Sequence, residues 1–96
     1  MKPSDKLNAN RDAIRAIVAA HRAFNARVFG SAARGDDTEA SDLDILVDPG
    51  PKTTLFDLGA IRHELEMLLG VNVEVLTPNA LPESFRDVVL AEAERI

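Results

Sequence analysis

Apolar residues recur at steps of three and four along two long stretches of the chain, and this spacing is typical of one face of a helix. It covers residues 4–24 and then about 54 to 69, where Gly70 stands at the position expected for a helix-ending glycine. The same spacing returns after Pro82, a residue suited to the first helical position. We therefore predict three helices, the last reaching residue 96.

Between these helices the pattern changes to an alternation of apolar and polar residues, which predicts strands. The alternation covers residues 43–47 and 71–76, and a shorter β-prone run covers 27–29. A helix between the second and third strands makes a crossover connection, which leaves those two strands parallel. Three strands with helices on one face form a small two-layer α/β domain.

The composition narrows the class of protein without changing this fold. The chain has 96 residues, which fits one domain, and we expect an N-terminal helix over 1–25 and a core over 26–96. It has no cysteine, which excludes disulfides and thiolate metal sites. It has no signal-peptide pattern and no apolar run of membrane-spanning length. A cytoplasmic protein without a membrane partner is therefore expected.

The charge is negative and unevenly distributed. A net charge of −5 argues against direct binding of nucleic acid, because that binding needs Lys and Arg to neutralise phosphates. Six acids and no bases lie between Asp36 and Asp48. Such a segment would repel a nucleotide unless cations lie between them.

Two of these acids, Asp42 and Asp44, stand one residue apart at the head of a predicted strand. Side chains alternate across a strand, so both project from one face, with Cα atoms roughly 6.5–7 Å apart. Mg²⁺ takes one or two protein carboxylates and completes its shell with water and substrate phosphate. On the next predicted strand Glu74 lies on the face opposite the valines, where it can join the two aspartates.

A turn with phosphate-binding character precedes these acids. The segment from Ser31 to Arg34 favours a single helical turn, with Ser31 as its N-cap and Gly35 at its end. Gly30 permits close approach of a ligand to the backbone, and the N–H groups of the turn can bind an anion. The Ser31 hydroxyl can donate to a phosphate oxygen, and Arg34 can neutralise phosphate charge.

Simpler interpretations of the same residues stay open. Ser41 and Asp44 could form a helix capping box, although the apolar run that follows favours a strand. The acids could be surface charge without a metal, at the cost of repulsion between neighbours on one strand face. Arg34 could cap the carbonyls of the short helical turn, and Glu74 could be a solvated strand residue.

The combined spacing resembles a known family. Gly30-Ser31, ten residues, and then Asp42-Leu43-Asp44 is similar to the signature of the DNA polymerase β-like nucleotidyltransferase superfamily. The whole run from Gly30 to Val47 resembles its minimal nucleotidyltransferase (MNT) branch, as does the segment from Gly70 to Thr77. The resemblance implies a small two-layer α/β nucleotidyltransferase fold, with a mixed three- to four-stranded sheet and helices mainly on one face.

The resemblance also implies a role for each matching residue. Asp42 and Asp44 would hold two Mg²⁺ ions that bind ATP and assist attack on its α-phosphorus, while Gly30 and Ser31 would bind phosphate. A third carboxylate, usually Asp in the family, would bind the catalytic metal, and here it is Glu74. The extra methylene moves this carboxylate by about 1–1.5 Å, which affects catalysis more than nucleotide binding.

Many MNT proteins resemble antitoxins that pair with a HEPN-domain ribonuclease toxin. The first hypothesis is therefore a Mg²⁺-dependent enzyme that transfers AMP from ATP to a tyrosine hydroxyl of such a toxin, acting as an antitoxin in a complex with it. The second is a catalytically weak or inactive MNT-fold antitoxin that neutralises its toxin by binding alone. Transfer to RNA or to a small molecule is disfavoured by the acidic surface and by the lack of a second domain in 96 residues.

Overall fold

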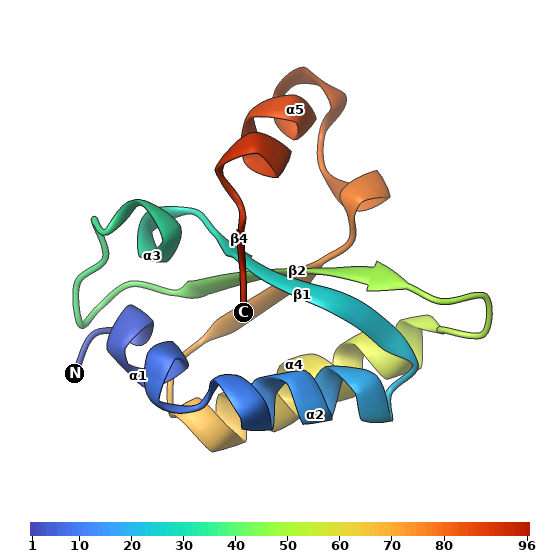
Figure 1. Cartoon of the computed structure of the whole chain (residues 1–96), viewed down its shortest axis with the longest axis horizontal. Coiled ribbons are helices and arrows are strands. Elements are labelled where there is room, and N and C mark those ends of the chain that lie inside the picture. The colour runs from blue at the N-terminus through green and yellow to red at the C-terminus, as the bar shows by residue number, and fades with distance from the viewer.

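The computed structural model describes all of residues 1–96, with helices alternating with the strands of a single sheet (Figure 1). The elements in chain order are α1 (Pro3–Ala9), α2 (Arg11–Ala20), β1 (Ala23–Phe29), α3 (Ser31–Arg34), β2 (Leu43–Pro49), α4 (Leu55–Leu69), β3 (Val73–Leu76), the 3-10 turn η1 (Pro78–Ala80), α5 (Glu83–Glu92) and β4 (Glu94–Arg95).

The four strands form a mixed sheet in the order β3-β2-β1-β4. β1 is antiparallel to both β2 and β4, whereas β2 and β3 are parallel and are joined through α4. The predicted parallel pair and the mixed two-layer α/β fold are thereby confirmed. None of the helices combines the length and the apolar character that a membrane crossing requires.

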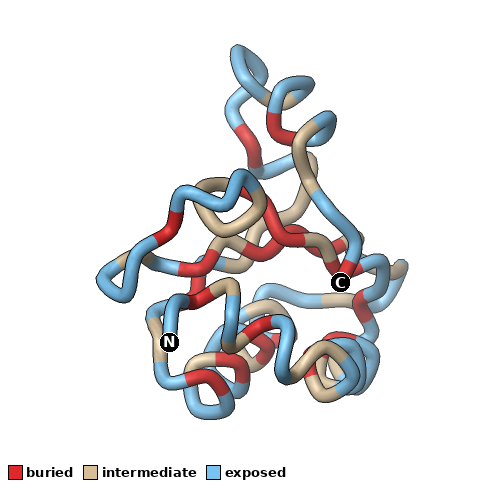
Figure 2. Tube along the Cα trace, turned by 60° about the vertical axis from the view of Figure 1, so that its left-hand side comes forward, coloured by how far each residue is buried: buried red, intermediate tan, exposed pale blue.

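The two faces of the sheet are covered unequally. Helices α1, α2 and α4 lie on one face, while α5 stands on the other (Figure 1). The main core lies under the three helices and contains 14 buried residues, among them Leu43, Ile45 and Val47 of β2. A second cluster of only four buried residues lies on the α5 side, and Figure 2 shows that much of this end of the molecule is exposed. Most of the folding free energy must therefore come from the helical face.

Helix α4 begins and ends where its sequence predicts. Thr54 caps the first turn through a capping box with Asp57, whose side chain accepts from the Thr54 backbone N–H at 2.9 Å. Gly70 ends the helix in the left-handed conformation, with φ of 68°. These two signals fix the ends of α4, and the chain then continues into β3 at Val73.

The prediction of one helix over residues 4–24 was wrong. The helix is broken at Asn10, whose side-chain amide donates to the Lys6 carbonyl and competes with the helical backbone pattern. The second helix ends at Ala20, and a left-handed Arg22, with φ of 66°, turns the chain into β1. β1 therefore begins at Ala23, four residues earlier than predicted. The last two residues of the predicted helix, Ala23 and Phe24, belong to this strand.

The C-terminal helix also ends earlier than predicted. α5 stops at Glu92, and the next residues form β4 against the outer edge of β1, pairing Arg27 with Arg95 and Val28 with Glu94. The Ile96 N–H donates to the Ala26 carbonyl, which extends this pairing. The backbone N–H and C=O groups at the outer edge of β1 need hydrogen-bond partners. Residues 94–96 supply them as a strand, although their apolar spacing fits a helix.

Candidate active site

Two of the predicted acids, Asp44 and Glu74, lie on the face of the sheet away from the three covering helices. Leu43 and Ile45 are in the main core, so Asp44 between them points to the opposite face. The sheet register aligns Asp44 with Phe29 of β1 on one side and with Glu74 of β3 on the other. The structure therefore brings together residues from three strands at one point of the open face.

The Asp44 carboxylate lies directly against Gly30. A Cβ atom added to Gly30 would collide with Asp44 Oδ2. Gly30 also has φ of 72° and ψ of −152°, a backbone conformation that is essentially restricted to glycine. Both the local conformation and the close approach of Asp44 thus require glycine at this position.

The acids of this face lack partners within the protein. Asp42, Asp44 and Glu74 form no side-chain hydrogen bond or ion pair in the structure, although Asp44 is partly buried. Burial, and then the nearby charges of Glu74 and Asp42, raise the pKa of the Asp44 carboxyl above its ordinary value, while Arg34 opposes this shift. The site therefore carries negative charge that its own residues do not neutralise.

The carboxylates of Asp42, Asp44 and Glu74 are of the chemical type that binds a magnesium ion. Unpartnered carboxylate oxygens are ligands that Mg²⁺ accepts, and a cation would relieve the repulsion at Asp44. No group of three His, Asp or Glu side chains is arranged so that it could hold a metal ion in this conformation. Asp42, exposed just before β2, lines a polar hollow of about 460 Å³ with Glu66 and Asn72.

The helical turn after Gly30 has the predicted extent, but its N-cap is Gly30 and not Ser31. Ser31 makes no side-chain hydrogen bond within the protein, so its hydroxyl is free for a ligand. Arg34 donates to Asp36 Oδ2 and to Glu92 Oε1, each at 3.3 Å, and not to the carbonyls of α3. The alternative in which Arg34 caps the short helix is therefore wrong.

The alternative capping box is also wrong. Asp44 lies within β2, and the Ser41 hydroxyl accepts from the Thr38 backbone N–H at 2.9 Å. This contact stays inside the loop before the strand.

Glu92, at the end of α5, is not among the site residues that the sequence predicts. In the structure its carboxylate accepts from the Gly30 N–H at 3.1 Å and from Arg34 at 3.3 Å. Glu92 is 62 residues from Gly30, so no local pattern could have indicated this contact.

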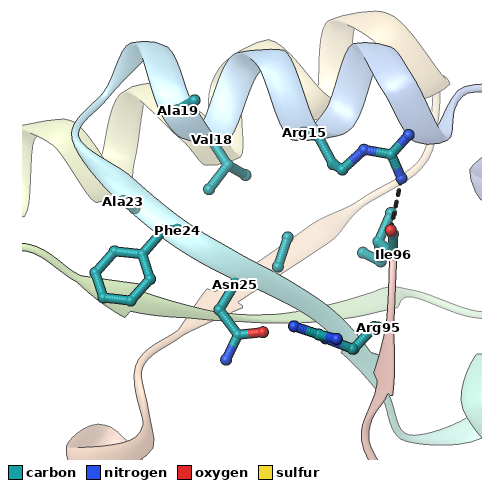
Figure 3. Close-up of a pocket in the computed structure, with 9 residues that line it drawn as sticks. Arg15, Val18, Ala19, Ala23, Phe24, Asn25, Arg95 and Ile96 are labelled. Carbon is teal, nitrogen blue, oxygen red and sulfur yellow. Dashed lines mark hydrogen bonds between the residues drawn. The ribbon is translucent and has the colours of Figure 1, made fainter.

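A separate groove lies at the other end of β1. It has a volume of about 410 Å³ between α2, the first residues of β1 and the residues of β4, with Arg15 and Arg95 at its margin (Figure 3). It contains none of the predicted site residues. The open face near Gly30 thus remains the candidate site.

The comparisons with known proteins agree with this geometry. Residues 12–96 match the family model of the nucleotidyltransferase domain. A candidate protein adenylyltransferase of Methanocaldococcus jannaschii, MJ0435, is 43% identical over 77 residues, which span 80% of this chain and 83% of the relative. The protein adenylyltransferase MntA of Thermococcus cleftensis is 38% identical over 65 residues, spanning 68% of this chain and 66% of that protein.

Two solved structures have the same fold. A candidate minimal nucleotidyltransferase superposes with a TM-score of 0.83 at 41% identity, covering 97% of this chain and 93% of that one. A toxin–antitoxin crystal structure with AMP-PNP superposes with a TM-score of 0.75 at 17% identity, covering 90% and 71% of the two chains. The chain belongs to the nucleotidyltransferase domain family, and its resemblance to the minimal branch is confirmed.

Replacing Gly30 by Ala should lower the free energy of unfolding by about 2–4 kcal/mol, because the new Cβ meets Asp44 in a conformation restricted to glycine. Gly35→Ala is the matched control, since Gly35 also has positive φ but has no neighbour within 4 Å of an added Cβ, and it should cost only about 1 kcal/mol. Urea unfolding measures both. Equal losses would contradict the close approach of Asp44.

Replacing Asp44 by Asn should stabilise the metal-free protein at pH 7 by a few tenths to about 1 kcal/mol. The folded-state pKa of Asp44 is raised, so its ionised form costs stability at neutral pH, and this cost disappears as the pH falls through the raised pKa. The gain should therefore shrink on acidification. Thermal unfolding across pH 3–7 measures it.

The same variant should respond less to magnesium. Mg²⁺ that binds the folded state raises its stability, so added Mg²⁺ should raise the Tm of the wild type more than that of Asp44→Asn. Asp87→Asn, which removes an exposed and unpaired carboxylate of α5, should respond like the wild type. Equal responses of all three proteins would place the ion elsewhere.

Proposed function

We propose that this protein is a Mg²⁺-dependent nucleotidyltransferase that transfers AMP from ATP to a tyrosine hydroxyl of a HEPN-type toxin and so acts as an antitoxin. The observation that carries the proposal is the packing of Asp44 against Gly30 beside unpartnered acids on one sheet face. This arrangement juxtaposes a cation-binding group with a backbone that a phosphate can approach.

Each site residue would have a distinct task. Asp42, Asp44 and Glu74 would hold two Mg²⁺ ions, which when bound would neutralise the triphosphate and polarise its α-phosphorus. The Gly30 N–H and the free Ser31 hydroxyl would donate to phosphate oxygens. Arg34, which is half-exposed, would supply a positive charge at the same position.

Glu74 would place the third carboxylate near the attacking hydroxyl. It is exposed and stands beside Asp44 in the parallel register, so its side chain has room to reach toward the site. Its extra methylene relative to Asp changes where the carboxylate can settle. The rate of transfer should depend on this length more than nucleotide affinity does.

A protein acceptor is supported by the relatives. One homologue bears the name protein adenylyltransferase, and a structure of the same fold comes from a toxin–antitoxin complex. By this analogy the acceptor is a toxin held in a complex with this chain. The chain itself would act as one domain over residues 1–96, in the cytoplasm. ATP is the proposed nucleotide, in line with the AMP-PNP of that complex.

The second candidate function is neutralisation of the toxin by binding alone. It is favoured by the absence of any three acids arranged for a metal ion and by Glu74 in place of Asp. The two functions differ in whether a covalent AMP appears on the partner.

Incubation with labelled ATP, Mg²⁺ and the product of the adjacent gene should transfer label to that partner. Asp44→Ala should reduce the transfer rate at least about a hundredfold, because it removes a ligand of the ions that stabilise the transferring phosphate. Asp87→Ala, which removes an exposed acid in the middle of α5, should leave the rate unchanged. A tight complex without any transfer would refute the enzyme and leave the binding function.

Glu74→Asp should raise the transfer rate about tenfold or more if Glu74 is a metal ligand displaced from the family's usual position. The binding affinity for ATP should change little. The same labelled-ATP assay measures this variant beside the wild type. An unchanged rate would indicate that Glu74 is only a surface residue.

A further inference from the structure

The Glu92 carboxylate lies at the position proposed for a phosphate group. Its Oε1 atom accepts from the Gly30 N–H at 3.1 Å and from Arg34 Nη1 at 3.3 Å, and its Oε2 atom is 3.5 Å from the same nitrogen. One backbone N–H and one guanidinium thus converge on a single anion. Glu92 is well covered, with a quarter of its side chain exposed, whereas half of Arg34 is exposed.

These donors cannot serve two anions at once. The Gly30 N–H is a single donor, so a phosphate oxygen that accepts from it must displace the Glu92 carboxylate. The Glu92 carboxylate and a phosphate are both anions that accept hydrogen bonds. If both were next to the Gly30 N–H, their negative charges would repel each other. Glu92 and a nucleotide phosphate therefore compete for one position.

The helix that carries Glu92 is held to the rest of the protein by few contacts. Val89 is the only buried residue of α5, and it belongs to the small four-residue cluster. The one arginine of the helix, Arg86, donates to carbonyls of the preceding segment, Leu81 and Asn79, and not to the sheet. Figures 1 and 2 show α5 standing off the sheet with most of its length exposed. The contact of Glu92 is thus a main link between the end of α5 and the site.

We infer that Glu92 is an internal competitor for the phosphate of ATP. It occupies the Gly30 and Arg34 donors in the nucleotide-free protein, lowers the apparent affinity for nucleotide, and is displaced when nucleotide enters. The end of α5 then loses its link to Gly30, so occupancy of the site is transmitted to this helix. This inference rests on the proposed nucleotide-binding function.

Titration calorimetry with ATP and Mg²⁺ tests the competition. Glu92→Ala should bind ATP about three- to tenfold more tightly, because an apparent affinity is reduced by the fraction of molecules whose site is free. Glu94→Ala is the matched control: it removes the same charge two residues away, where Glu94 makes no side-chain hydrogen bond or ion pair. It should change the affinity less than twofold. Glu92→Gln, which keeps the side-chain size, should fall between the wild type and Glu92→Ala.

Hydrogen exchange provides a second measurement on the wild-type protein. ATP with Mg²⁺ should accelerate amide exchange in the last turn of α5, whereas α4 should be unaffected or slowed. In Glu92→Ala this turn should already exchange fast without nucleotide.

The possible failures are distinguishable. If the wild type binds ATP but Glu92→Ala binds it equally or more weakly, the competition is refuted while the nucleotide site stands. If ATP protects the end of α5 from exchange, displacement is refuted in the same way. If neither the wild type nor any variant binds ATP, the proposed function fails, and the competition fails with it.

Discussion

The close approach of the Asp44 carboxylate to the backbone of Gly30 is the constraint on which the site depends. It ties the turn after β1 to the middle of the sheet, because β2 lies between β1 and β3 and holds Asp44 in register with both neighbours. Any side chain at position 30 would separate the two. The backbone proposed to bind phosphate and the carboxylate proposed to bind a cation therefore form one local structure, which strand pairing holds in place.

This arrangement divides the work between the two faces of the sheet. The helical face contains 14 of the 18 buried apolar residues, so it supplies most of the free energy that stabilises the fold. The opposite face can then carry unpaired carboxylates, including a partly buried one whose pKa is raised. An acidic patch of this kind is unfavourable by itself, and the core on the other face compensates for it. The main hydrophobic core and the proposed site therefore lie on opposite faces of the same sheet.

The features that sequence analysis predicted correctly are those with a local signal. The alternation around Asp44 and Glu74 indicated which residues face the core, and the threonine and glycine at the ends of α4 marked its limits. The N-terminal error arose because Phe24 fits the helical spacing of the preceding residues although it lies in β1. Only the pairing with β2 decides between the two, and pairing is a property of the folded chain.

The end of the chain illustrates the same limit. β4 has two residues, too few for any periodicity, and exists because the outer edge of β1 requires hydrogen-bond partners. The contact between Glu92 and Gly30 joins residues that are 62 positions apart. Neither could be read from neighbouring positions. The sequence motif predicted which residues to expect at the site, and it gave no sign of Glu92, which only the folded chain brings next to Gly30.

The position of β1 has a consequence for how the protein is made. β1 precedes both of its partners in the chain, and its outer edge is covered only after residues 94–96 have been synthesised. Until then a run of backbone donors and acceptors remains open on a strand with apolar side chains. Long-range pairing of this kind is slow compared with helix formation. During synthesis, the outer edge of β1 is therefore open to association with another chain until β4 pairs with it.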